Sequence, residues 1–467
     1  MTLLNRREFL SWAGAAASSA CAGVSEPRNR HLFLDSRVVE RAGNAVLRIG
    51  KARKDPRNPL FGEQKPWEAR FDNLYANVVH EPRTGLYRCW YSPFIVDEAV
   101  HTIPRAERNR KPYRAMKREM GVCYAESDDG FRWTKPALGL VEFEGSRGNN
   151  LVCRGPHGAG VFRDARERDP ARRYKMFFQG KTTSGAFSPD GIHWAEAVPF
   201  ASIGAVGDTH NNAIWARTLS RYIGITRLWD RATKQRLVGR TESQDFIHWT
   251  KAEEVLRADA KTPESQTYAM PIFEYAGLYL GLLMMFHVPS DTVACELAWS
   301  ADTVRWERVD PGNALIPLGA AGACDCGCVY AAATPVVLDN EIRLFYGASN
   351  GQHTGWRDGF FCLAHLRPDG FAAMEPRTAN NGATVITRPV EVAGDNLRVN
   401  VDAAGGEVRV GVAGEERLSI ERCAPVRGDH IDAECRWRGA NLKQLRGKRV
   451  QLVFALRSAR AYSFRFV

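Results

Sequence analysis

The sequence predicts an all-β fold, a five-bladed β-propeller followed by a C-terminal β-sandwich, and three observations carry this prediction. A motif recurs in which a serine is followed two residues later by aspartate and six later by tryptophan. Each repeat also contains short alternating apolar runs separated by Asp-Gly and similar turns, which is typical of β-strands. After Pro376 the motif disappears while the alternation continues. The motif tryptophans lie 55 to 61 residues apart, at Trp133, Trp194, Trp249 and Trp306.

A period above fifty residues with strand-like alternation favours propeller blades over a helical solenoid. A fifth unit ends in a degenerate copy, residues 366–371, with Phe371 in place of tryptophan. The expected inner strands are 74–80, 160–163, 212–216, 269–275 and 330–338. We interpret the motif as structural, because Asp-Gly favours a turn with positive φ and the following tryptophan can pack between neighbouring blades at the outer rim.

Segments outside the five repeats complete the predicted architecture. Residues 31–34 and 45–49 are strand-like and are expected to supply the outer strand that closes the ring. The predicted sandwich strands are 387–391, 397–401, 406–412, 418–421, 450–456 and 461–466. The predicted domains are therefore an export signal at 1–25, the propeller at 30–374 and the sandwich at 376–467.

The leader indicates export. Arg6-Arg7 precedes an alanine-rich apolar stretch too short to be a permanent membrane span, which is typical of a twin-arginine signal. Lipidation at Cys21 is the alternative to simple cleavage, and either predicts a periplasmic or secreted protein. The ten later cysteines are expected to be mostly buried free thiols.

The 467 residues carry a net charge of +11, spread along the chain. No basic run interleaved with aromatic residues is evident, so nucleic acid is not an expected partner. An acidic glycan would suit the charge, and a solvated surface is the plainer interpretation. The oligomeric state is left open.

Acidic residues occur at equivalent places before four of the inner strands. These residues are Asp72, Asp208, Glu264 and Asp325, whereas the second unit has His157 or Gly158 there. Inner strands begin near the propeller axis, so such side chains converge on one cavity. Three carboxylates around one cavity suit glycoside cleavage, which needs a nucleophile or base, a protonated acid and a third group that tunes them. The alternative is that each acid caps a turn or pairs with an arginine.

On these residues the chain resembles the five-bladed propeller glycoside hydrolases of families 32, 43 and their relatives, whose family 32 members often carry a C-terminal sandwich. The resemblance implies that Asp72 is the nucleophile or base, Asp208 the modulating residue and Glu264 the general acid. The Asn-Asp-Pro-Asn-Gly signature of the fructan enzymes is absent, and Arg168-Asp169-Pro170 falls in an outer turn. Fructan specificity is therefore not supported.

Further residues near the same rim are candidate substrate contacts. Trp67 could stack on a sugar face. The remaining candidates are Asn73, His210, Asn211, Arg227, Gln266, Tyr268, His287 and Asp325. Cys324, Cys326 and Cys328 would share one strand face, but no second group of ligands accompanies them, so neither a metal nor a cofactor is expected.

Three alternatives to hydrolysis stay open. A glycan-binding propeller without catalysis would carry carboxylates that are far apart or salt-bridged. A glycoside phosphorylase would need Arg, Lys or His beside the acid to hold phosphate, for which Arg227 and His287 are candidates. A structural role for the C-terminal sandwich is the third.

Overall fold

This computed structural model describes residues 30–467 except 109, 206, 260–263 and 379–380. The fold is all-β, as predicted. The predicted export signal and Cys21 lie outside the described residues. None of the helices in the described part of the chain is long and apolar enough to cross a membrane.

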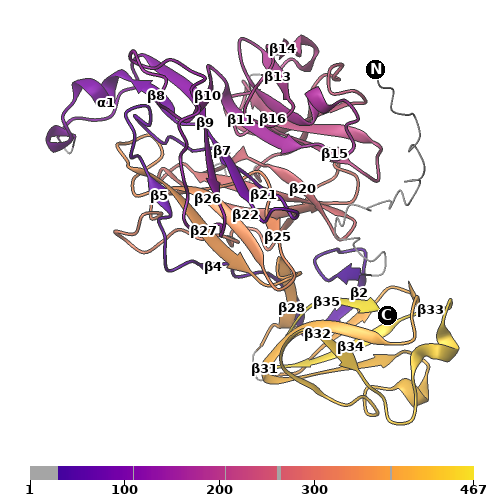
Figure 1. Ribbon diagram of the computed structural model, residues 1–467. Helices are drawn as coiled ribbons and strands as arrows, with labels where there is room; N and C mark the ends of the chain where they lie inside the picture. The colour runs from indigo at the N-terminus through magenta and orange to yellow at the C-terminus, as the bar shows by residue number, and fades with distance from the viewer. Residues whose placement is uncertain (1–29, 109, 206, 260–263, 379–380) are drawn as a thin grey trace, which may run out of the picture.

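Antiparallel sheets follow one another along the first four fifths of the chain (Figure 1). The first contains β6 (Asn77–His80), β7 (Tyr87–Tyr91), β9 (Arg118–Ser127) and β10 (Leu151–Arg154), with β8 (Phe94–Asp97) also paired to β9. The second contains β11 (His157–Arg163), β12 (Tyr174–Gln179), β13 (Thr183–Ser188) and β14 (Val198–Pro199). The third contains β15 (Asn212–Ala216), β16 (Arg221–Asp230), β17 (Gln235–Ser243) and β18 (Glu253–Leu256).

The fourth and fifth sheets are joined by one parallel pair, Val293 with Cys328. The fourth contains β19 (Ser265–Ala269), β20 (Ile272–Tyr275), β21 (Leu278–His287), β22 (Thr292–Ser300) and β23 (Glu307–Val309). The fifth contains β24 (Cys328–Ala331), β25 (Val336–Val337), β26 (Ile342–Ser349) and β27 (Gly359–Leu366). Strand β6 contacts β11, β11 contacts β15, β15 contacts β20, and β25 returns to β6, so the five sheets form a closed circuit.

The outer strands of the fifth sheet come from the start of the described chain. These strands are β4 (Arg53–Lys54) and β5 (Phe61–Gly62), which pair with β27. The prediction that residues 31–34 and 45–49 close the ring is therefore wrong. Those residues lie in or next to β1 (Arg30–Leu32) and β3 (Ala45–Ile49), which pair with β35 and β28 of the C-terminal sheet. Apolar alternation shows that a segment is a strand, but not which sheet edge it joins.

The C-terminal sheet has nine strands and a hydrophobic core of its own. Besides β1 and β3 it contains β2 (Val39–Gly43), β28 (Ala372–Pro376), β29 (Ala383–Thr387), β31 (Leu397–Val412), β32 (Val426–Cys435), β34 (Leu452–Arg457) and β35 (Arg460–Phe466). Strands β30 (Val390–Glu391) and β33 (Arg449–Val450) pair separately. The strand predicted at 418–421 is wrong, because the 3-10 helix η4 (Glu416–Leu418) ends at Leu418 and the following residues form a turn.

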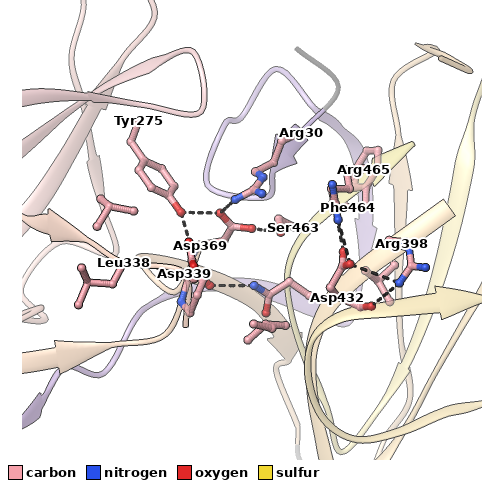
Figure 2. Close-up of a pocket in the computed structure, with 15 residues that line it drawn as sticks. Arg30, Tyr275, Leu338, Asp339, Asp369, Arg398, Asp432, Ser463, Phe464 and Arg465 are labelled. Atoms are coloured by element: carbon pink, nitrogen blue, oxygen red, sulfur yellow. Dashed lines mark hydrogen bonds and ion pairs between the residues drawn. The ribbon is translucent and has the colours of Figure 1, made fainter. Parts of the chain in front are cut away.

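A polar joint connects this sheet to the ring of five sheets (Figure 2). Asp369 of the degenerate repeat is buried there. It accepts hydrogen bonds from Arg30 (3.0 Å), Tyr275 (2.7 Å) and Ser463 (2.5 Å). The carboxylate thereby connects β1, the fourth sheet and β35. The cavity beside it, of about 260 Å³, has a mixed lining in which Arg30 pairs with Asp369, and Arg398 and Arg465 pair with Asp432.

The serine-aspartate-tryptophan motif folds the same way in all four copies. In the first, Ser127 Oγ accepts from Gly130 N (2.9 Å) and Asp129 Oδ1 accepts from Phe131 N (2.7 Å). Trp133 Nε1 donates to Gly130 O (3.2 Å). The other copies repeat these bonds. The turn requires positive φ at its fourth position, as the Asp-Gly pairs predicted.

The motif tryptophans pack between adjacent sheets. Trp133 lies against Phe345 and Phe361 of the fifth sheet, at 5.8 and 5.4 Å between ring centroids. Trp249 of the third unit lies 5.0 Å from Phe177 of the second sheet. The structural interpretation of the motif is confirmed for these two residues.

Candidate functional site

A cavity of about 280 Å³ is lined by residues at or before the starts of inner strands, such as Asp72, His157 and Asp208, and by residues of other segments, such as Arg236 and His353. This is near the lower end of ligand pockets, which span roughly 300–1,000 Å³. Its charged lining consists of the aspartates Asp72 and Asp208 and the arginines Arg70, Arg118, Arg227 and Arg236. Its other polar lining residues are Tyr113, Tyr268, His157, His353 and Thr354. The two aspartates that the repeat selected by equivalent position therefore face one space.

Asp72 is held by two guanidinium groups. Arg357 Nη2 donates to Asp72 Oδ1 at 2.7 Å, and Arg70 Nε lies 3.7 Å from the same oxygen. The Arg357 side chain is fully buried and that of Asp72 is 17% exposed. Burial raises the pKa of Asp72, but the positive charges of Arg357 and Arg70 outweigh burial and hold the pKa at about 2. Asp72 is therefore an ionised carboxylate at neutral pH.

The backbone around Asp72 is fixed by a neighbouring carboxyl group. Glu63 Oε1 accepts from Phe71 N (2.6 Å) and from Gly359 N (3.1 Å), so it joins the Asp72 segment to the Arg357 segment. Burial raises the pKa of Glu63 to about 7. Leu74, just beyond Asp72, has a φ of 62°, an uncommon left-handed conformation for a branched residue.

Asp208 lies against a histidine and an arginine. His157 Nε2 is 3.1 Å from Asp208 Oδ1, and Arg227 Nη1 donates to Asp208 Oδ2 at 3.2 Å. The contact with His157 contributes most to lowering the pKa of Asp208 below its ordinary range. The Asp208 side chain is 54% exposed, so one side faces the cavity. Gly158 permits this approach, because a Cβ there would overlap the backbone oxygen of Thr209.

His353 is a neutral imidazole beside Asp72. Burial and the charge of Arg357 lower its pKa to about 3. Its Nδ1 lies 2.8 Å from the hydroxyl of Tyr330, which accepts from Arg357 Nη1 at 3.1 Å. Because that arginine donates to the hydroxyl, the hydroxyl proton is directed to Nδ1, and we infer that Nε2 carries the imidazole proton.

The structure distributes the predicted substrate contacts over three environments. Arg227 and Tyr268 line the cavity. Asn73 is buried behind it, where its amide donates to the Tyr268 hydroxyl at 2.8 Å. His210 and Asn211 are also buried, and Asn211 uses its amide to hold the backbone of its own loop.

Trp67 and Asp325 are not among the cavity-lining residues. Trp67 packs against the core between the first and fifth sheets and donates to Asn150 Oδ1 at 2.6 Å. Asp325 pairs with Lys54 and accepts from the Tyr346 hydroxyl at 2.9 Å. Both side chains are therefore bound to structural partners.

Glu264, Gln266 and His287 also lie outside the lining. Glu264 is exposed immediately before β19, next to residues outside the described part of the chain, and its backbone oxygen accepts from Val288 N. Gln266 accepts from Arg236 Nη1 at 2.7 Å. His287 is exposed, with Nδ1 2.8 Å from Ser290 Oγ. The structure therefore does not bring Glu264 together with Asp72 and Asp208.

Several residues in or beside the cavity were not predicted from the sequence. Arg70 precedes Asp72 by two positions, and Arg236 follows the hairpin of the third sheet. His353 and Arg357 lie between β26 and β27, where His353 lines the cavity and Arg357 donates to Asp72. Arg70 does precede an inner strand, but it is not an acid. Arg236, His353 and Arg357 lie away from the starts of the inner strands, so acids at equivalent offsets did not indicate them.

The three cysteines of residues 324–328 lie in different environments. Cys324 Sγ lies 3.7 Å from Cys362 Sγ, and Cys328 is buried. Among the described residues, no group of three or more His, Cys, Asp or Glu side chains is placed to hold a metal ion. All ten described cysteines are free thiols.

Comparison with known proteins gives weak likenesses only. No protein-family model matches, and no curated protein matches. An N-acetylgalactosamine deacetylase from F. plautii, in complex with blood group B trisaccharide, is 15% identical over 68% of this chain and 96% of its own, with a TM-score of 0.46. A glycosyl hydrolase from Bacteroides ovatus is 13% identical over 69% and 95%, with a TM-score of 0.44. Similarity at this level does not transfer an activity to this chain.

Proposed function

We propose that this chain is a glycoside hydrolase built on a five-bladed propeller with a C-terminal sandwich, and that it cleaves a carbohydrate in the cavity of Asp72 and Asp208. The observation that carries the proposal is that these two aspartates, far apart in sequence, occupy equivalent positions and line one cavity. Each aspartate is also paired with an arginine, as the non-catalytic alternative expects, so the kinetics of the Asp72 variant decide between the two. The closed circuit of five sheets supports the propeller assignment.

The environments of the two aspartates suit different roles. Asp72, ionised and largely buried, can act as a nucleophile or activate a water molecule. Asp208, ionised and open to the cavity, can stabilise the positive charge that develops on the sugar ring. Neither can be the proton donor, because both pKa values are low. Glu264 keeps this role as a prediction, which requires it to reach the substrate from outside the cavity lining.

The experiment is a screen of aryl glycosides and oligosaccharides, followed by kinetics of three variants. Asp72→Asn should lower kcat roughly 10²–10⁴-fold, as expected for loss of an acid-base group, with Asp208→Asn also impaired. Glu264→Gln should lower kcat only if Glu264 is the general acid. Its matched control is Glu253→Gln, because Glu253 is an exposed glutamate on β18. Full activity of Asp72→Asn would overturn the proposal.

A glycoside phosphorylase is the second candidate, and one observation favours it. Arg227 and Arg236 lie beside Asp208, which is the cationic cluster that bound phosphate would require. Turnover that depends on inorganic phosphate and yields a sugar 1-phosphate would establish this activity. Turnover at the same rate without phosphate would exclude it.

We also propose that the protein is exported through the twin-arginine route, on the leader sequence alone. Replacement of Arg6-Arg7 by two lysines should retain the protein in the cytoplasm of a Tat-competent host. Unchanged export of that variant, measured by cell fractionation, would contradict the proposal.

A further inference from the structure

Arg70 is buried in the cavity wall with open hydrogen-bond donors. Its side chain is 3% exposed, and its Nε and Nη1 atoms are buried without a hydrogen-bond partner. Only Nη2 is bonded, donating to Gly355 O at 3.0 Å. The ring of Tyr113 lies 3.8 Å from the guanidinium carbon and holds the group flat. Burying a charged donor without an acceptor costs free energy, so an acceptor that enters the cavity would be bound strongly.

Arg236 offers a second open donor in the same cavity. Its Nη1 is bonded to Gln266, while its Nε is buried without a partner. Burial and the nearby charge of Arg227 lower the pKa of Arg236, so its positive charge is poorly compensated. Arg118 lies at the cavity edge, 4.6 Å from the Phe94 ring, and is exposed.

The charges of the lining do not balance. Four arginines face two aspartates, an excess of two positive charges before the buried Arg357 is counted. Arg357 and Arg227 make the direct contacts with Asp72 and Asp208. Arg70 Nε lies 3.7 Å from Asp72, too far for a hydrogen bond, so Arg70 keeps donors for a ligand beside Arg118 and Arg236. Planar guanidinium groups bind the oxygens of carboxylates, sulfates and phosphates in pairs, with charge-assisted hydrogen bonds.

We propose that Arg70, Arg118 and Arg236 form a subsite for an oxyanion carried by the substrate sugar, either a uronate carboxylate or a sulfate ester. The inference rests on the proposed function, since it names the substrate class of the same cavity. The oxyanion would accept from the open donors of Arg70 and Arg236 and place the adjacent glycosidic bond near Asp72.

A basic arm beside the cavity favours a polymer over a single sugar. The arm is the segment between β8 and β9, and it contains α1 (Glu98–Thr102) and η1 (Arg105–Glu107), which project from the first sheet in Figure 1. It leads back to the cavity through Tyr113 and Arg118. Arg110, Arg114 and Lys117 are exposed on it. Successive anionic groups of one polysaccharide chain would meet this row of cations.

Titration calorimetry on the full chain tests the subsite. The probes are a galacturonate tetrasaccharide, a sulfated chondroitin tetrasaccharide, their uncharged counterparts with hydroxymethyl or hydroxyl groups, and inorganic phosphate. Asp72→Asn protein is used beside the unmodified protein so that turnover does not consume the probe. At least one anionic tetrasaccharide should bind roughly tenfold or more tighter than its neutral counterpart, and less tightly as salt is added.

Substitutions assign the binding to the named residues. Arg70→Met, Arg236→Met and Arg118→Gln should each weaken anionic binding roughly tenfold and weaken neutral binding by a smaller factor. Arg118 is exposed, so its variant tests the subsite even if a buried arginine is needed for folding. Arg132→Gln, an exposed arginine on a motif turn, is the matched control. Loss of Arg110, Arg114 and Lys117 together should weaken binding of polygalacturonate more than of its tetrasaccharide.

The outcomes separate this proposal from the proposed function. Equal affinity for charged and neutral tetrasaccharides, or unchanged affinity in the three arginine variants, would overturn the subsite while leaving hydrolysis intact. If phosphate binding requires Arg70 but anionic sugars bind no more tightly than neutral ones, the sugar subsite is overturned and the arginines bind a free oxyanion instead. Anionic sugars that bind through Arg70 but are never cleaved would support the subsite and contradict the hydrolase.

Discussion

The ion pair between Asp72 and Arg357 offers the sharpest test of the site. The Arg357 side chain is fully buried and that of Asp72 is 17% exposed, with 2.7 Å between Nη2 and Oδ1. Arg357→Met keeps an unbranched side chain but leaves a buried carboxylate with only the more distant Arg70. Breaking a buried pair typically costs about 3–5 kcal/mol, and we expect a loss of this size in the free energy of unfolding at pH 7.

The pKa of Asp72 gives a second measure of how strongly the arginines stabilise its charged form. Its fall from 3.8 to about 2 corresponds to about 2.4 kcal/mol of net stabilisation of the charged form. Since burial opposes the fall, the arginines together contribute more than this. In the unmodified protein this stabilisation is complete above pH 3.8 and is lost as the pH falls through about 2. In Arg357→Met we expect the opposite pH dependence of stability. Burial then raises the pKa of Asp72, so protonation of Asp72 at low pH stabilises the folded protein.

Chemical denaturation at pH 7 and pH 4 measures both effects. The double variant with Asp72→Asn should recover much of the loss, giving a coupling energy of roughly 2 kcal/mol or more. Arg132→Met is the matched control, because its pair with Asp129 is exposed and worth at most about 1 kcal/mol. Equal losses at Arg357 and Arg132, or no coupling to Asp72, would refute this account of the site.

Three further predictions concern other parts of the chain. Burial raises the pKa of Glu63 in the folded protein from 4.5 to about 7. The contribution of Glu63 to stability therefore falls as the pH rises from 4.5 to about 7. Glu63→Gln should reduce the difference in melting temperature between pH 5 and pH 8. Asp190→Ala removes an acceptor for two turn N–H groups and should lower the free energy of unfolding, measured by urea denaturation, by about 1 kcal/mol. An unchanged free energy would contradict the structural role of the motif. The thiol of Cys324, whose pKa is lowered first by its contact with Cys362, should alkylate faster than buried Cys295 in mass-spectrometric labelling, and equal rates would contradict this environment.

The repeat made much of the fold predictable. The serine-aspartate-tryptophan turn is closed by bonds within seven residues, so it forms wherever the motif occurs and marks the end of each unit. The strand assignment failed at 418–421, where the chain leaves a 3-10 helix and forms a turn instead. The sheet assignment failed at residues 31–34 and 45–49, because pairing between distant strands depends on edges that exist only in the folded chain.

By itself the sequence determined the all-β class, the repeat unit and the equivalent positions of Asp72 and Asp208, because these depend on local alternation, turn chemistry and counting. The tertiary structure decided which groups surround those carboxylates. Arg357 and His353 reach Asp72 from a segment almost three hundred residues away, and their charges and hydrogen bonds fix its protonation state. Glu264 satisfies the same counting rule and still lies outside the cavity lining, because equivalence along a repeat sets where a strand begins but not where its flanking side chain points.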